Sequence, residues 1–156
     1  MRANFFGAIL CIVGLLLSGV KSMSADGIIT LPSSFGAAET MRRLEAEIKA
    51  RGMTVFAHID HADGAAAIGL PLRPTDLLIF GAAKGGTPLM QSQQTAGIDL
   101  PLKALVWQDE NGTTYVSYND PAFIARRHGL ADNTKPAVEA MSNVLKSIAN
   151  KATTRP

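Results

Sequence analysis

Apolar and polar positions alternate along this chain with two different periods. In the segment 53–60, the side chains of Val55, Ala57 and Ile59 lie two positions apart, which is the spacing of a β-strand with one buried face. In the segment 35–48, apolar residues instead recur every three to four positions, with charged residues mainly between them, as in an amphipathic helix. The pattern therefore predicts both strands and helices.

The same signals continue along the rest of the chain. Five strands are predicted, over residues 27–31, 53–60, 76–82, 102–109 and 113–118. A long helix follows the first strand and opens with a serine N-cap in the segment Pro32-Ser33-Ser34, and a final helix follows Thr134. Shorter helical segments are predicted at 62–70, at 88–94 after an N-cap at Thr87, and after Asp120. This order of strand, helix, four strands and helix predicts an α+β fold, with helices on one face of a mostly antiparallel sheet.

The second face of the predicted sheet is also apolar. It should carry Leu78, Phe80, Leu105 and Trp107 or their neighbours on the strands, and such a patch is larger than soluble monomers usually leave in water. The inserted helices, a ligand or a second subunit must cover it. We expect a homodimer that buries at least about 1,000 Å² in total.

The first 24 residues have the features of a targeting segment. A short basic start precedes an apolar run from Phe5 to Val20, which is slightly shorter than the ~20 residues of a spanning helix and favours a signal peptide. Small residues at Ser22 and Ser24 predict cleavage before Ala25 and a periplasmic or secreted protein; the alternative is an uncleaved segment that tethers the chain to a membrane. The predicted organisation is a signal peptide at 1–24, a single domain at 25–150 and a frayed tail at 151–156.

Removing this segment changes the composition. Cys11, the lone cysteine, leaves together with Arg2 and Lys21, so that 15 basic residues become 13, against 13 acidic ones. A mature chain without cysteine forms no disulfide and has no thiol nucleophile. Its zero formal charge gives no electrostatic footprint for nucleic acid. We expect no nucleic-acid partner, no membrane insertion after cleavage and no cofactor.

The first candidate site is the turn after the second predicted strand. Asp60 and His61 end this strand, and a carboxylate beside an imidazole can tune the imidazole for acid–base chemistry. In the alternative interpretation, Asp60 caps the turn into Asp63 and His61 is a surface residue. His58 adds a second imidazole, but its spacing from His61 matches neither a zinc finger nor a helical HExxH motif, so we predict no metal site.

The second candidate site is the glycine-rich turn after the third predicted strand. Lys84, Gly85, Gly86 and Thr87 resemble an anion site, with a cation, permissive backbone and a helix N-terminus. The alternative is a turn that needs glycine for its φ angles. If both strands end at one edge, this turn joins the first candidate turn in a single ligand site made of Asp60, His61, Lys84, Gly86 and Thr87. Antiparallel neighbours would separate the two turns.

Five motifs in these segments together resemble the domain-of-unknown-function 302 family. They are Phe-Ala-His-Ile-Asp-His at 56–61, Leu-Arg-Pro-Thr at 72–75, Phe-Gly-Ala-Ala-Lys-Gly-Gly-Thr-Pro-Leu-Met at 80–90, Gly-Ile-Asp-Leu-Pro-Leu-Lys at 97–103 and Tyr-Asn-Asp-Pro at 118–121. The resemblance implies a small α+β fold of strand–helix–four strands–helix order, similar in topology to TATA-binding-protein-like folds, without implying DNA binding. Ala83 departs from the family pattern, in which many relatives have Asn or Pro before the basic residue. The family brings no established activity.

Three functional hypotheses follow. We favour an exported non-catalytic binding or interaction domain that holds a small anionic ligand. The first alternative is an acid–base enzyme that uses Asp60 and His61, although the sequence offers no evident nucleophile. The second alternative is an accessory subunit of a membrane redox or transport complex.

Overall fold

The chain folds around a five-stranded antiparallel sheet. The structure is a computed structural model that describes residues 27–155, so the predicted signal peptide lies outside the described residues and remains a prediction. In the sheet the strands have the order β1-β5-β4-β3-β2, and each neighbouring pair is antiparallel. The strands are β1 (Ile28–Pro32), β2 (Thr54–Asp60), β3 (Thr75–Gly81), β4 (Leu102–Gln108) and β5 (Thr114–Asn119).

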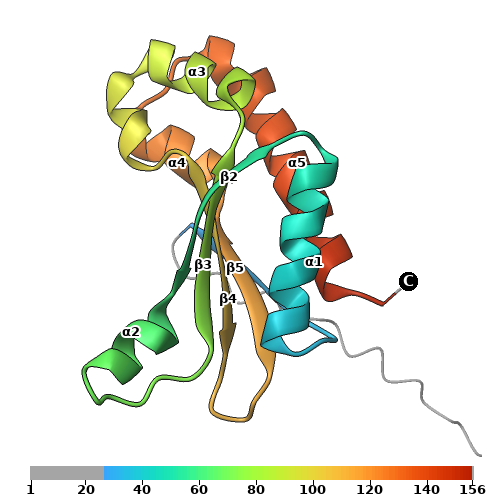
Figure 1. Ribbon diagram of the computed structural model, residues 1–156. Helices are drawn as coiled ribbons and strands as arrows, with labels where there is room; N and C mark the ends of the chain where they lie inside the picture. The colour runs from blue at the N-terminus through green and yellow to red at the C-terminus, as the bar shows by residue number, and fades with distance from the viewer. Residues whose placement is uncertain (1–26, 156) are drawn as a thin grey trace, which may run out of the picture.

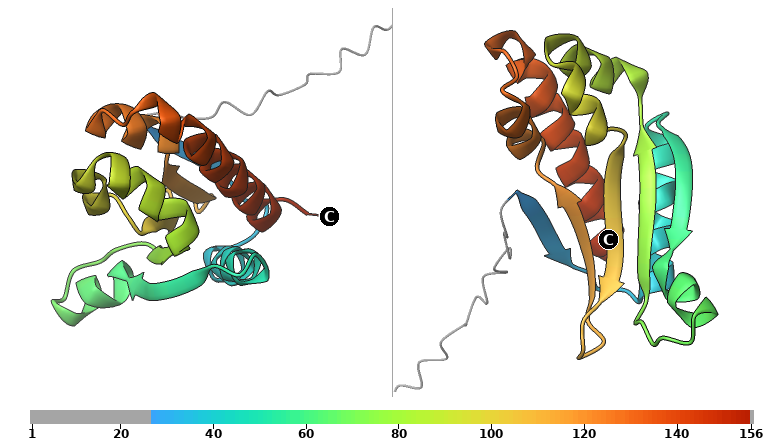
Figure 2. Two further views of the ribbon diagram at one scale, coloured as in Figure 1. Left: turned by 90° about the horizontal axis from the view of Figure 1, so that it is seen from above. Right: turned by 90° about the vertical axis from the view of Figure 1, so that its left-hand side faces the viewer.

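The helices lie on one face and at the two ends of this sheet (Figures 1 and 2). The long helices α1 and α5 lie side by side on one face, α2 extends the β2–β3 hairpin, and α3 and α4 lie at the opposite end. Their bounds are α1 (Ala37–Ala50), α2 (His61–Ala67), α3 (Ala83–Ser92), α4 (Pro121–His128) and α5 (Lys135–Thr153), with 3₁₀ turns η1 (Gln94–Ile98) and η2 (Asp132–Thr134). The predicted α+β class and the order of its elements are confirmed.

The core lies between the sheet and the two long helices. Alternate residues of the central strands point into it because side chains of a strand alternate between faces, and the helices add residues at three- and four-residue spacing. All of the following are at most 2% exposed: Leu44, Ile48, Leu78, Phe80, Ala104, Val106, Val116, Leu145 and Ile148.

The predicted composition of the second sheet face was partly wrong. Leu78 and Phe80 are fully buried under the helices, because Leu78 pairs with Ala104 and therefore shares its face. Leu105 pairs with Leu77 and lies on the open face, where both side chains are half-buried. The homodimer expected through this face remains a prediction.

Two helix starts also differ from the predictions. Helix α3 begins at Ala83, not at residue 88, and contains Pro88 in its interior. Proline lacks the N–H that would donate to the carbonyl of Lys84, four residues before it. Helix α3 therefore lacks one backbone hydrogen bond, which falls within its first two turns. Helix α1 begins after Gly36 rather than after a serine cap, and Ser33 instead shares a 2.7 Å hydrogen bond with the hydroxyl of Thr40.

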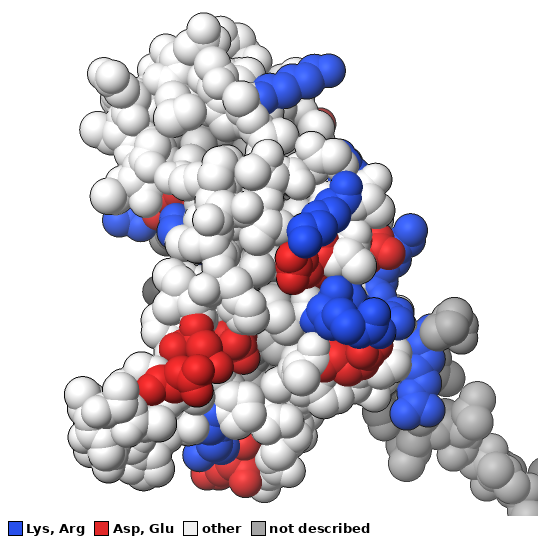
Figure 3. Space-filling model, viewed as in Figure 1, with Lys and Arg blue, Asp and Glu red and all other residues white. Residues whose placement is uncertain are grey.

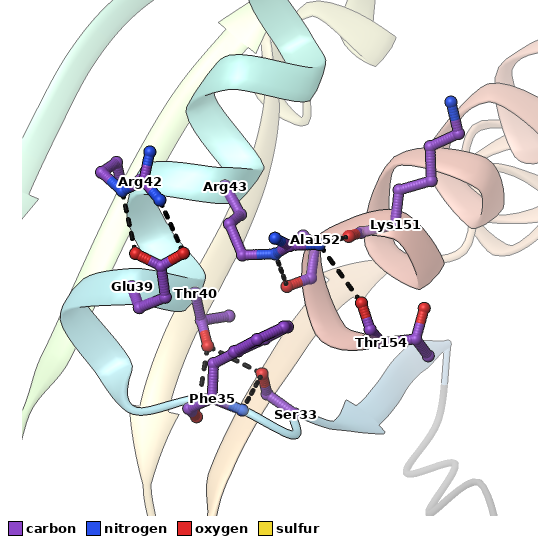
Figure 4. Close-up of polar contacts among 9 residues, drawn as sticks. All are labelled: Ser33, Phe35, Glu39, Thr40, Arg42, Arg43, Lys151, Ala152 and Thr154. Carbon is purple, nitrogen blue, oxygen red and sulfur yellow. Dashed lines mark hydrogen bonds and ion pairs between the residues drawn. The ribbon is translucent and has the colours of Figure 1, made fainter. Parts of the chain in front are cut away.

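Helix α1 also holds the C-terminal end of α5, through one arginine (Figure 4). Arg43 donates from Nε to the carbonyl of Ala152 at 3.3 Å, and from Nη2 to the carbonyls of Lys151 at 2.9 Å and Thr154 at 3.2 Å. Its guanidinium carbon lies 4.3 Å from the ring centroid of Phe35. The last carbonyls of a helix have no partner within it, so Arg43 acts as a side-chain cap for α5.

Candidate functional site

An apolar cavity opens at the end of the sheet that carries α3. Its volume is about 540 Å³, within the range of roughly 300–1,000 Å³ that is typical of small-molecule sites. The end of β3 and the beginning of β4 form its floor, and α3 and α5 form two of its walls. Larger apolar side chains complete the lining: Met53, Phe56, Met90, Leu100, Met141 and Val144.

Small residues keep this space open. The chain from Gly81 to Gly86 lines one wall without a large apolar side chain, and Ala137 and Ala140 face it from α5. A Cβ atom added at Gly86 would lie 3.4 Å from Leu100 Cδ1, so even one more carbon reaches the opposite wall. The cavity therefore depends on glycine and alanine at the positions where α3 and α5 approach each other.

The mouth of the cavity is open and apolar. Phe56 is 59% exposed although it lines the cavity, because the pairing of β2 with β3 shifts register between Val55 and Ala57 and such a bulge turns the extra residue out of the ladder. Figure 3 shows that the surface around α3 is mostly uncharged, whereas charged side chains gather over α1 and beside β2. This end of the molecule is suited to apolar contacts.

Among the described residues, Lys84 is the only charged residue that lines the cavity. None of the ion pairs within residues 27–155 includes it. Lys84 lies in the first turn of α3, whose N-cap residue Ala82 makes no side-chain capping hydrogen bond. The first N–H groups of a helix have no acceptor within the helix, so a positive charge and the positive end of a helix dipole lie together at this wall.

The single site predicted from both polar turns does not form. In the antiparallel pair of β2 and β3, Thr54 pairs with Gly81 and Asp60 pairs with Asp76, so Asp60 and Lys84 lie at opposite ends of the sheet. The separation follows from the pairing, because neighbouring antiparallel strands run in opposite directions and therefore finish at opposite ends of the sheet.

The two halves of that predicted site each have a local structure. Asp60 is the N-cap of α2 and accepts a hydrogen bond from the backbone N–H of Asp63 at 2.9 Å, as in the alternative interpretation, and His61 is the exposed first residue of this helix. At the other end, the N–H of Gly86 donates to the carbonyl of Ala82 at 3.2 Å. Thr87 lies inside α3 rather than at its start, so the predicted anion cradle of Gly86 and Thr87 amides is wrong.

Two of the three histidines, His58 and His128, lie beside carboxylates. His58 Nε2 lies 2.9 Å from Asp76 Oδ1, and His128 Nε2 lies 2.7 Å from Asp99 Oδ2. Within residues 27–155, no group of three or more histidine, cysteine, aspartate or glutamate residues is arranged to hold a metal ion.

Lys84 and the glycines of this cavity were predicted from the sequence, but its apolar walls were not. One signal could have revealed them: Ala137, Ala140, Met141 and Val144 have the three- and four-residue spacing of a single helix face. Two small residues on that face indicate a surface that does not fill the space in front of it.

Comparison with known proteins identifies the family. The chain matches the family described as "Domain of unknown function DUF302" over residues 29–148, and it belongs to this family. It resembles an uncharacterized conserved DUF302 protein from Bacillus stearothermophilus, with a TM-score of 0.73 and 22% sequence identity over 82% of this chain and 99% of that one. At this identity the likeness shows the fold alone.

Two relatives have names that describe a function. The chain is 44% identical over 122 residues to "Fluoride-specific ion channel FluC 1" of Brucella suis biovar 1 (strain 1330), and equally to the protein of that name from Brucella abortus biovar 1 (strain 9-941). These matches cover 78% of this chain but 48% and 45% of the relatives. The chain thus spans about half the length of the curated relatives it matches.

These names overturn the predicted periplasmic or secreted location, because an ion channel is a membrane protein. None of the helices within residues 27–155 has the length and apolar character needed to cross a membrane.

Proposed function

We propose that this member of the DUF302 family is a non-catalytic binding domain that takes up a small, mostly apolar molecule between α3 and α5. The observation that carries this proposal is the cavity of about 540 Å³ with its apolar walls. Open apolar cavities of this size with few polar groups are typical ligand sites. Filling this one would cover the exposed ring of Phe56 and its apolar neighbours at the mouth.

The lining favours binding over catalysis. A reaction needs a nucleophile, an acid or a base next to the bound molecule, and the only charged group at this cavity, among the described residues, is the Lys84 ammonium. Asp60 and His61, the residues of the alternative enzyme hypothesis, lie at the other end of β2. Their carboxylate and imidazole do not reach a ligand in this cavity.

A blocked cavity tests the proposal. The probe is N-phenyl-1-naphthylamine, a neutral apolar dye whose fluorescence rises when it leaves water. We expect saturable binding to the full chain and its loss in Gly86→Leu, because a side chain there projects toward Leu100 and Met90. The matched control is Gly64→Leu, another helical glycine, whose added Cβ would meet nothing within 4 Å.

Near-ultraviolet circular dichroism of both variants shows that each keeps its tertiary packing, so that a loss of signal reports the cavity and not unfolding. Equal dye binding by the wild type and Gly86→Leu, or no binding by any of the three proteins, contradicts the proposal.

The relatives favour a second candidate function, an accessory domain of a membrane ion-transport protein. The chain matches about half of proteins named as fluoride-specific ion channels, and the part described here contains no helix that could cross a membrane. In such a protein the pore would come from the other half, and this domain would act on it from outside the membrane.

Fluoride efflux from vesicles tests this second candidate. The full-length Brucella suis relative is compared with a version that lacks the segment matching this chain. We expect the shortened protein to conduct fluoride at a changed rate, and added full chain to restore the original rate. An unchanged rate without the segment argues against an accessory role.

A further inference from the structure

We infer that the ligand of this cavity is an anionic amphiphile, a carboxylate on a medium-length alkyl chain. The inference rests on the proposed binding function and adds the chemical class of the ligand. It follows from the uneven distribution of charge over the lining, which has one cation at the wall formed by α3 and apolar side chains elsewhere.

The head-group end is defined by Lys84. Lys84 is exposed and its ammonium has no ion-pair partner within residues 27–155, so it is available to a ligand. The start of α3 adds the positive end of a helix dipole next to it. No acidic residue among those described lines the cavity, so a ligand carboxylate would meet attraction without a competing repulsion. A cationic head group would be repelled at the same place.

The tail end is defined by the walls. Met90, Leu100, Met141 and Val144 offer side chains without hydrogen-bonding groups, so a ligand that carried further polar groups into this region would lose their hydration without replacement. Met53, Met90 and Met141 are flexible and adapt to chains of different length. The walls therefore select for an unbranched or lightly branched hydrocarbon.

The class can be tested by calorimetric titration of the full chain with matched ligands. Decanoate, decanol and decyltrimethylammonium share one tail and differ in head-group charge, and hexanoate and octanoate vary the tail. We expect decanoate to bind most tightly, with affinity rising by about fourfold for each added CH₂, the equivalent of ~0.8 kcal/mol. The advantage of decanoate over decanol should be about fivefold at low salt and should shrink as salt is added.

Lys84→Gln should remove the advantage of decanoate over decanol and leave the affinity for decanol unchanged. The matched control is Lys146→Gln, because Lys146 is a lysine of α5 that lines a separate hollow beside β1, and this variant should behave as the wild type. Lys84→Arg keeps the charge and should retain most of the preference.

The outcomes separate the two proposals. If decanol and decanoate bind equally, if decyltrimethylammonium binds best, or if Lys84→Gln changes nothing, the ligand class is wrong while the binding function stands. If none of these ligands binds and the neutral dye does not bind either, the binding function itself fails.

Discussion

Replacing Arg43 by methionine tests how α1 stabilises the end of α5. The substitution keeps an unbranched side chain of similar length but removes the three hydrogen bonds to α5 carbonyls and the cation over Phe35. Arg43 is half-buried, so water can reach the carbonyls once it is gone. We therefore estimate a loss of about 1 kcal/mol for the hydrogen bonds.

The cation–π contact at a partly exposed site adds about 0.5–1 kcal/mol. The free energy of unfolding should fall by about 2 kcal/mol in total. For a domain of this size each kcal/mol corresponds to about 3 °C, so the midpoint of thermal unfolding should fall by about 6 °C.

The neighbouring arginine provides the control. Arg42 pairs with Glu39 on the surface of α1, and its side chain is 71% exposed. Since exposed ion pairs contribute little to stability, Arg42→Met should leave the free energy of unfolding close to that of the wild type. Urea denaturation at several wavelengths measures both variants. Equal losses for the two substitutions would refute the assignment of Arg43 as the cap of α5.

Three further predictions concern the core, the pH response and the open sheet face. Leu78→Ala should lower the free energy of unfolding by about 3 kcal/mol, and a loss below about 1 kcal/mol in urea denaturation would contradict its place under the helices. A hydrogen bond from Arg51 holds the pKa of Glu47 below its ordinary value of 4.5. The stability that ionised Glu47 adds to the folded protein is therefore complete above that value and is lost as pH falls through the lowered pKa. Glu47→Gln should therefore cost about 0.5–1 kcal/mol near neutral pH and progressively less as the pH falls through the lowered pKa of Glu47; a cost that does not change with pH argues against this pairing. If the open face forms the expected homodimer, sedimentation should give a dimer for the wild type and a monomer for Leu105→Lys, and a monomeric wild type at all concentrations ends that expectation.

The sheet and its helices could be predicted because their periods are strong. The two-residue period of β2 and the three- and four-residue spacing in α1 each depend only on which face is buried. Faces of different strands are harder to match, because the relation between Leu78 and Leu105 depends on the register of β3 against β4. A shift of one residue exchanges the two faces, and that register cannot be read from the sequence alone.

The candidate site was harder to predict for a related reason. Asp60 and Lys84 follow consecutive strands in the sequence, and this suggested a shared site. Antiparallel pairing of the two strands puts the residues at opposite ends of the sheet instead. The cavity itself results from what is missing from Gly86 and Ala140, namely side chains that would fill the space. An absence of volume becomes a cavity only when two elements face each other, and only the three-dimensional fold shows that α3 and α5 do so.

The pairing of β1 with β5 also sets the order in which the chain can fold during synthesis. Thr30 and Ser117 share a 2.8 Å hydrogen bond between their hydroxyls across 87 positions of sequence, and the partners of β1 in the sheet all lie between Tyr115 and Asn119. At about 5–20 residues per second, a ribosome needs roughly 4–17 s to reach β5 after it has made β1. During that time the backbone N–H and C=O groups of β1 have no strand to bond to, and α1 has no α5 to pack against. The first strand to be made is therefore the last strand of this sheet to find its partner. A nascent chain that stalls before β5 leaves the unpaired β1 accessible to chaperones and to other chains.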